Sequence, residues 1–268
     1  MAALAPAVRY NLRMRTLLAR VVVLLLVPWS AARGEPETDL GDRVRARPLS
    51  AHAWLIRSVS ALEGFGDVES NAVLVTGATE SVLVDTPATD EQTAPVLAWA
   101  EKTLRRPVRH LIVTHWHADR MGGIGAARAR QVATYAFGRT RALARQKGLV
   151  VPEHELGPAE RLTLAGLSLA TWYPGHGHTA DNIVVWLPED GVLVAGCFVK
   201  DAAAGTLGNV READPVQWAT GVAALRRRYP GARIVVPGHG AAGGSELLAR
   251  TTALLEAHGS RGVPASGR

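Results

Sequence analysis

The chain has 268 residues, of which 47% are hydrophobic and 20% charged, so it can bury one large core and a single α/β domain is expected. The formal net charge is +6 at pH 7. Residues 1–32 contribute four arginines and no acid, which leaves +2 for the rest of the chain. This balance gives no basic surface for nucleic acid, so no nucleic-acid partner is expected.

Residues 1–32 resemble a secretory signal peptide. Arginines precede the apolar run 21–29, and small side chains follow at 30–32, where signal peptidase requires them. The run is too short to cross a membrane, and no cysteine near its end offers a site for lipidation. We therefore expect export to the periplasm without a stable membrane anchor. A start at Met1 and a start at Met14 are both compatible with this pattern.

The rest of the chain alternates strand and helix patterns within one domain. Residues 33–49 are charged and contain Pro and Gly, which predicts a flexible lead-in; the folded domain is expected over 50–258 and a disordered tail over 259–268. Strands are expected at 51–60, 71–76, 81–85, 108–114, 132–135, 161–164, 167–173, 182–187, 192–195 and 233–236. Helices are expected at 90–104, after Gly123, at 138–147, from Asp214-Pro215 and from Ser245.

A metal-binding pattern follows the β-branched strand 108–114. His115, His117 and Asp119 stand at alternate positions, which in extended backbone would place all three side chains on one face. Histidine and carboxylate ligands suit zinc, and the end of a buried strand holds them firmly while leaving them within reach of solvent. Gly122 and Gly123 are expected to let the backbone turn beside these ligands.

Three further ligand candidates stand at or just beyond the ends of other predicted strands: His178, Cys197 and His239. Cys197 is the only cysteine, so an exported chain would carry it without an intramolecular disulfide. It is therefore either buried as a small hydrophobic residue or held as a thiolate by a metal. Because strand ends form the natural crevice of an α/β fold, we expect all the candidate ligands to converge there.

The chemistry of the candidates favours a division into two zinc sites. Three imidazoles, those of His115, His117 and His178, would hold one zinc and leave a position for water, as in catalytic zinc sites. The second zinc would be held by Asp119, Cys197 and His239. The soft thiolate favours zinc over magnesium or manganese, and coordination would protect the single cysteine under oxidising conditions.

These motifs resemble those of the metallo-β-lactamases, specifically the subclass with a cysteine ligand and two zinc ions. The resemblance covers residues 50–258, and the matching motifs are His115-x-His117-x-Asp119, Gly-His178-Thr-x-Asp-Asn, Gly-Cys197-x-x-Lys200 and Pro-Gly-His239-Gly. It implies an αββα sandwich, in which two mixed β-sheets lie face to face and are flanked by helices. Cys197 and Lys200 make the match specific, because His-x-His-x-Asp alone is shared by the wider superfamily.

The resemblance also implies an activity, namely zinc-dependent hydrolysis of the β-lactam amide of penicillins, cephalosporins and carbapenems, which confers antibiotic resistance. Two Zn²⁺ ions would be the cofactors, and Asp119 would orient the hydroxide between them. Lys200 would pair with the carboxylate of the small-molecule substrate, and Asn209 would polarise the lactam carbonyl. Because enzymes of this family are usually monomers, a monomer is expected.

Supporting roles are predicted for four other residues. Asp85, at the end of a strand, resembles the family's aspartate that hydrogen-bonds the ligand loop, and Arg120 could neutralise the ligand carboxylate and thiolate. Phe65 stands in the glycine-rich loop 61–70, which would suit a flap over the site. His176, two residues before His178, imitates a His-x-His pair but departs from the family pattern. It is read as a loop residue near the metal.

Two alternatives to a lactamase follow from the same motifs. A thioester or lactone hydrolase would share the scaffold, but such relatives usually carry His immediately after the motif's Asp and a later bridging Asp; here Arg120 and Cys197 stand instead. A protein of another class would bind zinc without turnover. The presence of Lys200, Asn209 and the predicted flap argues against that alternative.

Overall fold

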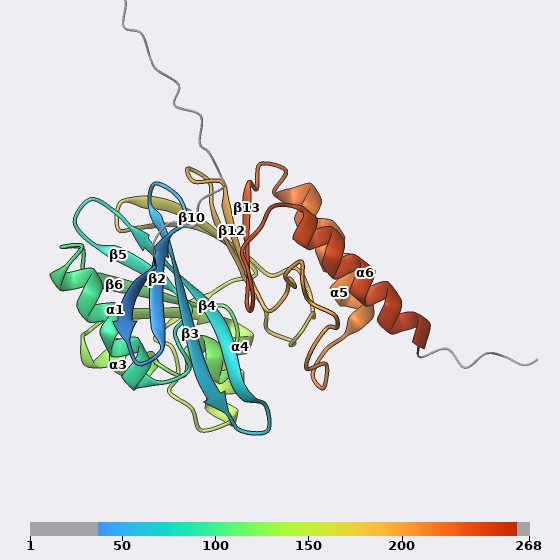
Figure 1. Cartoon of the computed structure of the whole chain (residues 1–268), viewed down its shortest axis with the longest axis horizontal. Coiled ribbons are helices and arrows are strands. Elements are labelled where there is room, and N and C mark those ends of the chain that lie inside the picture. The colour runs from blue at the N-terminus through green and yellow to red at the C-terminus, as the bar shows by residue number, and fades with distance from the viewer. Residues whose placement is uncertain (1–36, 262–268) are drawn as a thin grey trace, which may run out of the picture. The chain divides into compact units, whose positions relative to one another are not determined.

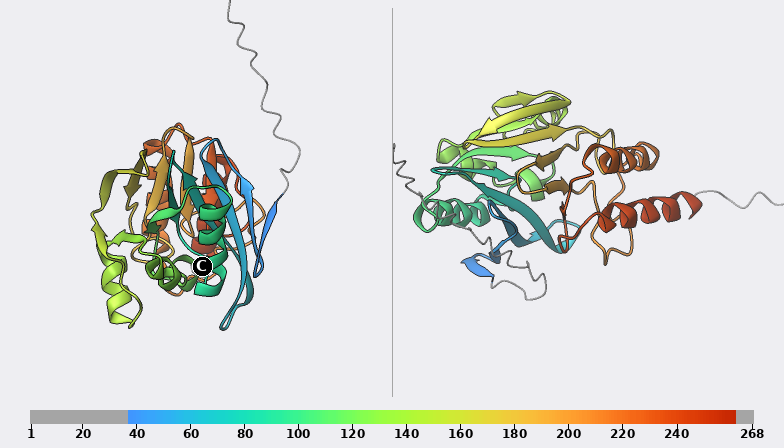
Figure 2. Two further views of the ribbon diagram at one scale, coloured as in Figure 1. Left: turned by 90° about the vertical axis from the view of Figure 1, so that its left-hand side faces the viewer. Right: turned by 90° about the horizontal axis from the view of Figure 1, so that it is seen from above.

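In the computed structural model, the described residues 37–261 form two β-sheets that lie face to face with helices outside them (Figures 1 and 2). All of these residues belong to one compact unit. This arrangement is the αββα sandwich that the sequence motifs implied. The predicted signal peptide over 1–32 lies outside the described residues. Within 37–261, no helix has the length and apolar character needed to cross a membrane.

The first sheet has eight strands in the order of the sequence, β1 to β8. Its strands are β1 (Thr38–Gly41), β2 (Val44–Pro48), β3 (Ala53–Leu62), β4 (Gly66–Thr76), β5 (Ser81–Val84), β6 (Val108–Val113), β7 (Ala133–Phe137) and β8 (His154–Leu156). Pairing is antiparallel from β1 to β5, as expected for the opening of the domain, and parallel from β5 to β8. The sheet is therefore mixed.

The second sheet has five strands in the order β13-β12-β11-β10-β9. They are β9 (Ala159–Leu164), β10 (Leu167–Trp172), β11 (Val184–Leu187), β12 (Val192–Gly196) and β13 (Ile234–Pro237). The strands from β9 to β12 pair antiparallel, whereas β12 and β13 pair parallel because α5 lies between them in the chain. This sheet is also mixed.

Alternation of side chains along the strands builds separate cores on the two faces of each sheet. In β4, Ala72 and Leu74 join the core under the helices of the first sheet, whereas Val73 and Val75 join the core between the sheets. Successive residues of a strand point to opposite faces, so an unbroken apolar run is the pattern of a strand buried on both sides. The core between the sheets fixes their relative position.

The helices cover the outer faces of the sandwich. On the first sheet lie α1 (Asp90–Lys102), α3 (Ile124–Ala129) and α4 (Gly138–Gln146). On the second, α5 (Pro215–Arg228) and α6 (Glu246–Arg261) lie side by side near β12 and β13 (Figure 1). The Asp214 carboxylate accepts hydrogen bonds from the amides of Val216 and Gln217, which caps α5 as its Asp-Pro start predicts.

Two predicted boundaries are wrong. The predicted flexible lead-in over 33–49 contains β1 and β2. These two strands pair with each other, and β2 also pairs with β3. Val44 and Ala46 are buried while Arg45 between them is exposed, which is the alternation of an amphipathic strand. The charged composition of the segment led to the wrong prediction of a flexible lead-in. The predicted tail over 259–268 begins too early, because α6 continues to Arg261; the remainder lies outside the described residues.

The predicted loop over 61–70 is also wrong in part, because it belongs mostly to a long hairpin. Strands β3 and β4 stay paired as far as Leu62 and Gly66, and only three residues form the turn. Gly64 and Gly66 have φ values of 78° and 71°, a region that favours glycine. The apolar residue at the tip, Phe65, is 52% exposed, so the predicted flap exists as a hairpin.

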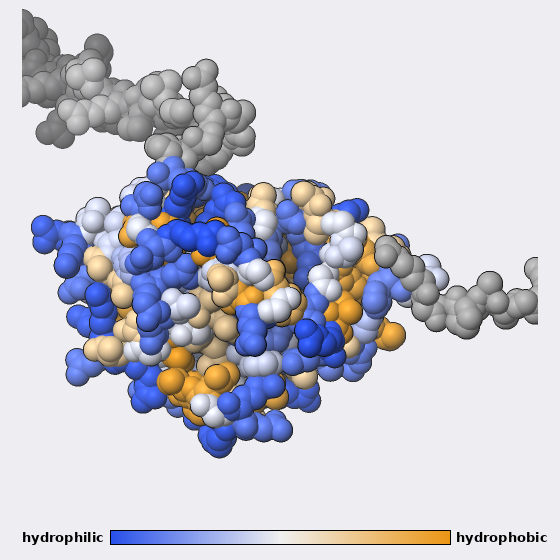
Figure 3. All heavy atoms as spheres, turned by 60° about the horizontal axis from the view of Figure 1, so that its bottom comes forward, coloured by the Kyte–Doolittle hydropathy of each residue, from blue (hydrophilic) through white to orange (hydrophobic). Residues whose placement is uncertain are grey.

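The surface of the sandwich carries few large apolar side chains. The exposed large hydrophobic residues among those described are Phe65, Leu149, Val150 and Val216. The face shown in Figure 3 is mostly hydrophilic, with hydrophobic residues in small separate groups. Single exposed apolar residues are normal on a soluble fold, so none of them by itself marks an interface.

We predict that Leu74→Ala destabilises the protein by about 2–5 kcal/mol, because it leaves a cavity in a close-packed core. Leu74 is fully buried in the middle of β4. Val216, which is 78% exposed on α5, provides the control: Val216→Ala should change the free energy of unfolding by less than about 0.5 kcal/mol. Urea denaturation of both variants measures the difference, and equal effects would contradict the assigned core.

Candidate metal centre and active site

The predicted metal-binding stretch lies where β6 ends, but its backbone does not stay extended. His117 is the N-cap of a short helix, α2 (Ala118–Met121), and Asp119 lies in its first turn. The expected alternation on one face of a strand is therefore wrong beyond Val113. The change from strand to helix moves the Asp119 carboxylate away from the line of the two imidazoles, so a single stretch can serve two metal positions.

The three predicted imidazoles of the first site converge. Nδ1 of His117 lies 3.2 Å from Nε2 of His115 and 3.2 Å from Nε2 of His178. Nitrogen ligands at about 2.0–2.1 Å around a tetrahedral zinc lie about 3.4 Å apart, so these spacings fit one zinc ion.

The second predicted trio converges beside the first. Sγ of Cys197 lies 3.3 Å from Nε2 of His239, and Oδ2 of Asp119 lies 3.4 Å from that nitrogen and 3.9 Å from the sulfur. These three ligand atoms lie within 4.8 Å of one another, as do those of His115, His117 and Asp119. Thiolate, imidazole and carboxylate together form a donor set for zinc. All six predicted ligands therefore meet at one place.

Arg120, predicted to balance the charge of these ligands, is completely buried beneath them. Its guanidinium donates to Oδ2 of Asp119 at 2.8 Å and to the carbonyl oxygens of Asn71 and Gly238 at 2.5 and 2.6 Å. Burial alone would raise the pKa of Asp119 and of the Cys197 thiol. The adjacent guanidinium and nearby imidazoles, such as that of His239, together outweigh burial and lower both pKa values, which favours the anionic, ligating forms.

The imidazoles are held in their neutral forms by burial. Desolvation lowers the pKa of His115 and of His178 well below the usual value, and neighbouring positive groups add to the effect. Burial also lowers the pKa of His117. Neutral imidazole is the form that binds a metal, so these rings are prepared for it at neutral pH.

The ligand loops are oriented by hydrogen bonds from outside the site. Asp85 accepts from the amide and the hydroxyl of Thr114 at 2.7 and 2.8 Å, which fixes the chain immediately before His115, as predicted. Nδ1 of His239 donates to the carbonyl oxygen of Glu69 at 2.6 Å. These contacts set ring orientation and tautomer, which metal-binding histidines require.

The glycines after Asp119 lie at the predicted turn, between the end of α2 at Met121 and the start of α3 at Ile124. Gly122 has a φ of −63°, so the turn does not depend on a positive φ there. A Cβ at this position would lie 1.9 Å from the carbonyl oxygen of Ala88. Gly122 is therefore required for the close approach of two backbone segments at this turn.

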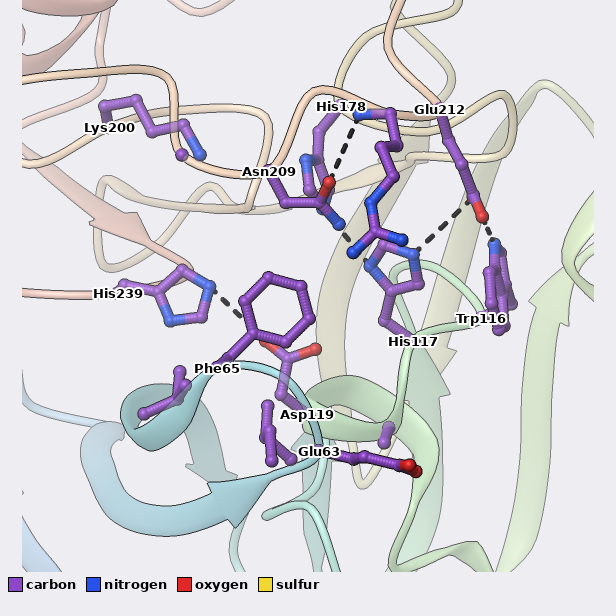
Figure 4. A pocket seen from close by; sticks show the side chains of 15 residues that line it. Glu63, Phe65, Trp116, His117, Asp119, His178, Lys200, Asn209, Glu212 and His239 are labelled. Carbon is purple, nitrogen blue, oxygen red and sulfur yellow. Dashed lines mark hydrogen bonds and ion pairs between the residues drawn. The ribbon is translucent and has the colours of Figure 1, made fainter.

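A pocket of about 540 Å³ opens over the ligands. Figure 4 shows the hairpin side chains Glu63 and Phe65 on one side of it and Lys200, Asn209 and Glu212 on the opposite side. His117, Asp119, His178 and His239 lie in its lining. Four of the six predicted metal ligands therefore face the same cavity as the predicted substrate-binding residues, whereas His115 and Cys197 are buried and do not line it.

Two polar groups of the pocket wall are held in defined orientations. Oδ1 of Asn209 accepts from the amide of Arg211 at 3.2 Å, which leaves the side-chain NH₂ group as the part available to a ligand. Nζ of Lys200 lies 5.4 Å from the ring centroid of Trp218, and burial lowers the pKa of this lysine. Both residues offer donors to an anionic or carbonyl-bearing ligand.

Comparison with known proteins identifies the family. The profile described as the metallo-beta-lactamase superfamily matches residues 65–239. The chain is 36% identical to the type 2 metallo-beta-lactamase of Bacteroides fragilis over 235 residues, which cover 88% of this chain and 94% of that protein. The chain belongs to the metallo-β-lactamase family. Its relatives include the type 2 metallo-beta-lactamase of Bacillus cereus, which is 36% identical over 78% of this chain and 81% of that protein.

Solved structures of metallo-β-lactamases support the same assignment. The enzyme from Pontibacter korlensis superposes with a TM-score of 0.76 at 35% identity, covering 80% of this chain and 99% of that one. FIM-1 from Pseudomonas aeruginosa, solved in a mono-zinc form, gives a TM-score of 0.76 at 35% identity, covering 82% and 99%. The metallo-β-lactamase fold, inferred from the motifs, is confirmed.

Sequence reasoning missed two residues, Glu212 and Asn71, that support this metallo-β-lactamase site. Oε2 of Glu212 accepts from the indole N–H of Trp116 at 3.1 Å and lies 3.6 Å from Nε2 of His117. The side-chain amide of Asn71 donates to the carbonyl oxygens of Pro237 and Gly240 at 3.0 and 2.8 Å, bracing the turn that carries His239. No sequence signal marked them, because each depends on contacts between distant segments.

We predict that Cys197→Ser lowers zinc affinity at the Asp119-Cys197-His239 site by at least about tenfold, because a neutral hydroxyl is a poor ligand, while the three-histidine site keeps its metal. Competitive zinc titration counts the sites, and cobalt substitution reports the lost thiolate-to-metal absorption band. Wild-type protein titrated in parallel is the control. Equal weakening of both sites would show that our division of the ligands is wrong.

Proposed function

We propose that this metallo-β-lactamase hydrolyses the amide bond of β-lactams with two zinc ions, one held by three histidines and one by Asp119, Cys197 and His239. The observation that carries the proposal is that both ligand trios converge at one pocket, which is lined by Lys200 and by four of the six candidate ligands. Relatives at 36% identity are metallo-beta-lactamases. Such an activity confers resistance to β-lactam antibiotics.

The roles of the ligands follow from the chemistry that the metal supplies. Zinc bound there would lower the pKa of water and polarise a carbonyl. The ligand oxygen of Asp119 lies within 4.8 Å of the ligand atoms of His115 and His117 and of those of Cys197 and His239. The Arg120 guanidinium helps to keep this carboxylate ionised. Asp119 can therefore accept a hydrogen bond from the attacking water and orient it. The buried histidines remain neutral and hold the site in shape. No protein nucleophile is required.

The pocket walls would bind the substrate. Lys200 would donate a charge-assisted hydrogen bond to the carboxylate that β-lactams carry. The NH₂ group of Asn209 would stabilise negative charge on the lactam oxygen as the carbonyl is attacked. Phe65, on the hairpin across the pocket, would cover the apolar part of the substrate and exclude water.

Alternative functions of the same scaffold make different use of the site. A thioester or lactone hydrolase would need the substrate pocket but has no need of a buried lysine beside the second metal trio. A zinc-binding protein without turnover would need neither Lys200 nor Asn209 in the cavity. Both side chains line the pocket, which favours β-lactam hydrolysis over these alternatives.

The cellular setting is also part of the proposal. The arginine-rich and apolar pattern of residues 1–32 supports export to the periplasm, where β-lactams meet their targets. A monomer, the usual state of enzymes of this family, is part of the same proposal. Gel filtration with light scattering, and fractionation of cells expressing the full chain, test these two points.

Purified protein should hydrolyse a carbapenem, and removal of zinc with a chelator should abolish the activity until zinc is restored. A glutathione thioester serves as the competing substrate in the same assay. Hydrolysis of the thioester without hydrolysis of the carbapenem would overturn the proposal in favour of a thioester hydrolase. Tight zinc binding with neither activity would favour the non-catalytic alternative.

We expect Lys200→Ala to raise KM for a β-lactam by about 10- to 100-fold, because a hydrogen bond to a charged group contributes about 1.5–3 kcal/mol. Lys102, exposed at the end of α1, is the matched control, and Lys102→Ala should leave KM unchanged. Steady-state kinetics with a carboxylate-bearing penicillin measure the effect. An unchanged KM for Lys200→Ala would remove this residue from the binding site.

A further inference from the structure

His176 makes a contact that the metal chemistry does not use. Its Nε2 lies 2.6 Å from the carbonyl oxygen of Glu212, 36 residues further along the chain. A carbonyl can only accept, so Nε2 must carry the hydrogen and donate it. A nitrogen committed to this bond cannot at the same time bind a metal. Among the described residues, His176 also belongs to none of the side-chain clusters that could hold a metal, so it does not act as a His-x-His partner of His178.

The same two segments are joined by a second hydrogen bond. The amide of Asp214 donates to the carbonyl oxygen of Gly177 at 3.1 Å. Residues 176–177, just before the ligand His178, thus hold residues 212–214, just before α5. Because both bonds end on backbone atoms of the 212–214 segment, they fix the path of the chain there.

The side chain of Glu212 extends this connection to the first metal trio. Its carboxylate accepts from the Trp116 indole at 3.1 Å and lies 3.6 Å from His117, so it stands between these two rings (Figure 4). Trp116 is covered on its face by Nζ of Lys147, 3.9 Å from the ring centroid. Glu212 is therefore tied by its backbone to His176 and by its side chain to Trp116. We call these two ties the Glu212 clasp.

The clasp secures the pocket end of a long irregular segment. Between β12 and α5 the described chain has neither helix nor strand, and this stretch carries Asn209 on the pocket wall. Its other end is tied to α6, where Arg250 donates to the carbonyl oxygen of Ala204 at 2.9 Å. Asn209 lies between the two attachments, so its position depends on the clasp.

We propose that His176 is a positioning residue that acts through Glu212 to hold Asn209, and the pocket wall around it, over the metal centre. It belongs neither to the candidate metal ligands nor to the residues that line the pocket, so it works through Glu212 and the segment that it fixes. The expected effect of His176 on β-lactam kinetics rests on the proposed β-lactamase function. Its role in holding the segment that carries Asn209 does not.

The test compares three variants of the full-length enzyme. His176→Ala removes the donor, and His176→Gln keeps an N–H near the same place. His258→Ala, at an exposed position on α6, is the matched control. His176→Ala should lower kcat/KM for a β-lactam by about tenfold, mainly by raising KM, because the free energy of one lost hydrogen bond corresponds to a change of about that size. The zinc content should stay unchanged. His176→Gln should stay within about twofold of wild type.

Amide hydrogen exchange provides a readout that does not require turnover. Exchange in residues 207–214 should become faster in His176→Ala and remain close to wild type in His176→Gln and His258→Ala. Loss of zinc from His176→Ala would overturn the proposal by making His176 part of the metal site. Unchanged exchange in residues 207–214 of His176→Ala would also overturn the proposal. An equal loss of kcat/KM in His176→Ala and His176→Gln would overturn it as well. If the wild type hydrolyses no β-lactam, the proposed function fails. The role of His176 in holding the segment is then tested by amide hydrogen exchange alone.

Discussion

The buried guanidinium of Arg120 is the interaction on which the site depends. It lies under the metal ligands and joins three parts of the molecule: Asp119, the backbone of β4 at Asn71, and the turn after β13 at Gly238. A buried charge is costly unless it is paired and fully hydrogen-bonded. Asp119 pairs with it, and Cys197 lies close enough for the guanidinium to lower its pKa. Fold and metal chemistry therefore stabilise each other.

The sandwich places ligands from both sheets at one edge. His115, His117 and Asp119 follow β6 of the first sheet, whereas His178, Cys197 and His239 follow strands of the second. Neither sheet carries a complete ligand set for the second trio, since Asp119 must meet Cys197 and His239 across the interface. The apolar core between the sheets supplies the rigidity that such a shared site needs.

The pocket is completed by a hairpin of the first sheet and by an irregular segment of the chain. The β3–β4 hairpin brings Phe65 to one side, and the segment between β12 and α5 brings Asn209 and Glu212 to the other. A rigid scaffold that carries binding residues on loops is a common design, but such loops need local attachments to be precise. Hydrogen bonds to Glu212 and Ala204 supply these attachments here.

The sequence by itself determined the six metal ligands and the strand-helix alternation, because ligand type and hydrophobic periodicity are local properties. It also marked Lys200 and Arg120 by their places beside candidate ligands, whereas Asn209 and Asp85 were marked by their resemblance to residues of the family. Only the tertiary structure decided that β1 and β2 belong to the sheet, since these short charged strands form by pairing, β2 with β3 and β1 with β2. It likewise decided the roles of Asn71, His176 and Glu212, whose partners lie tens of residues away and leave no local pattern.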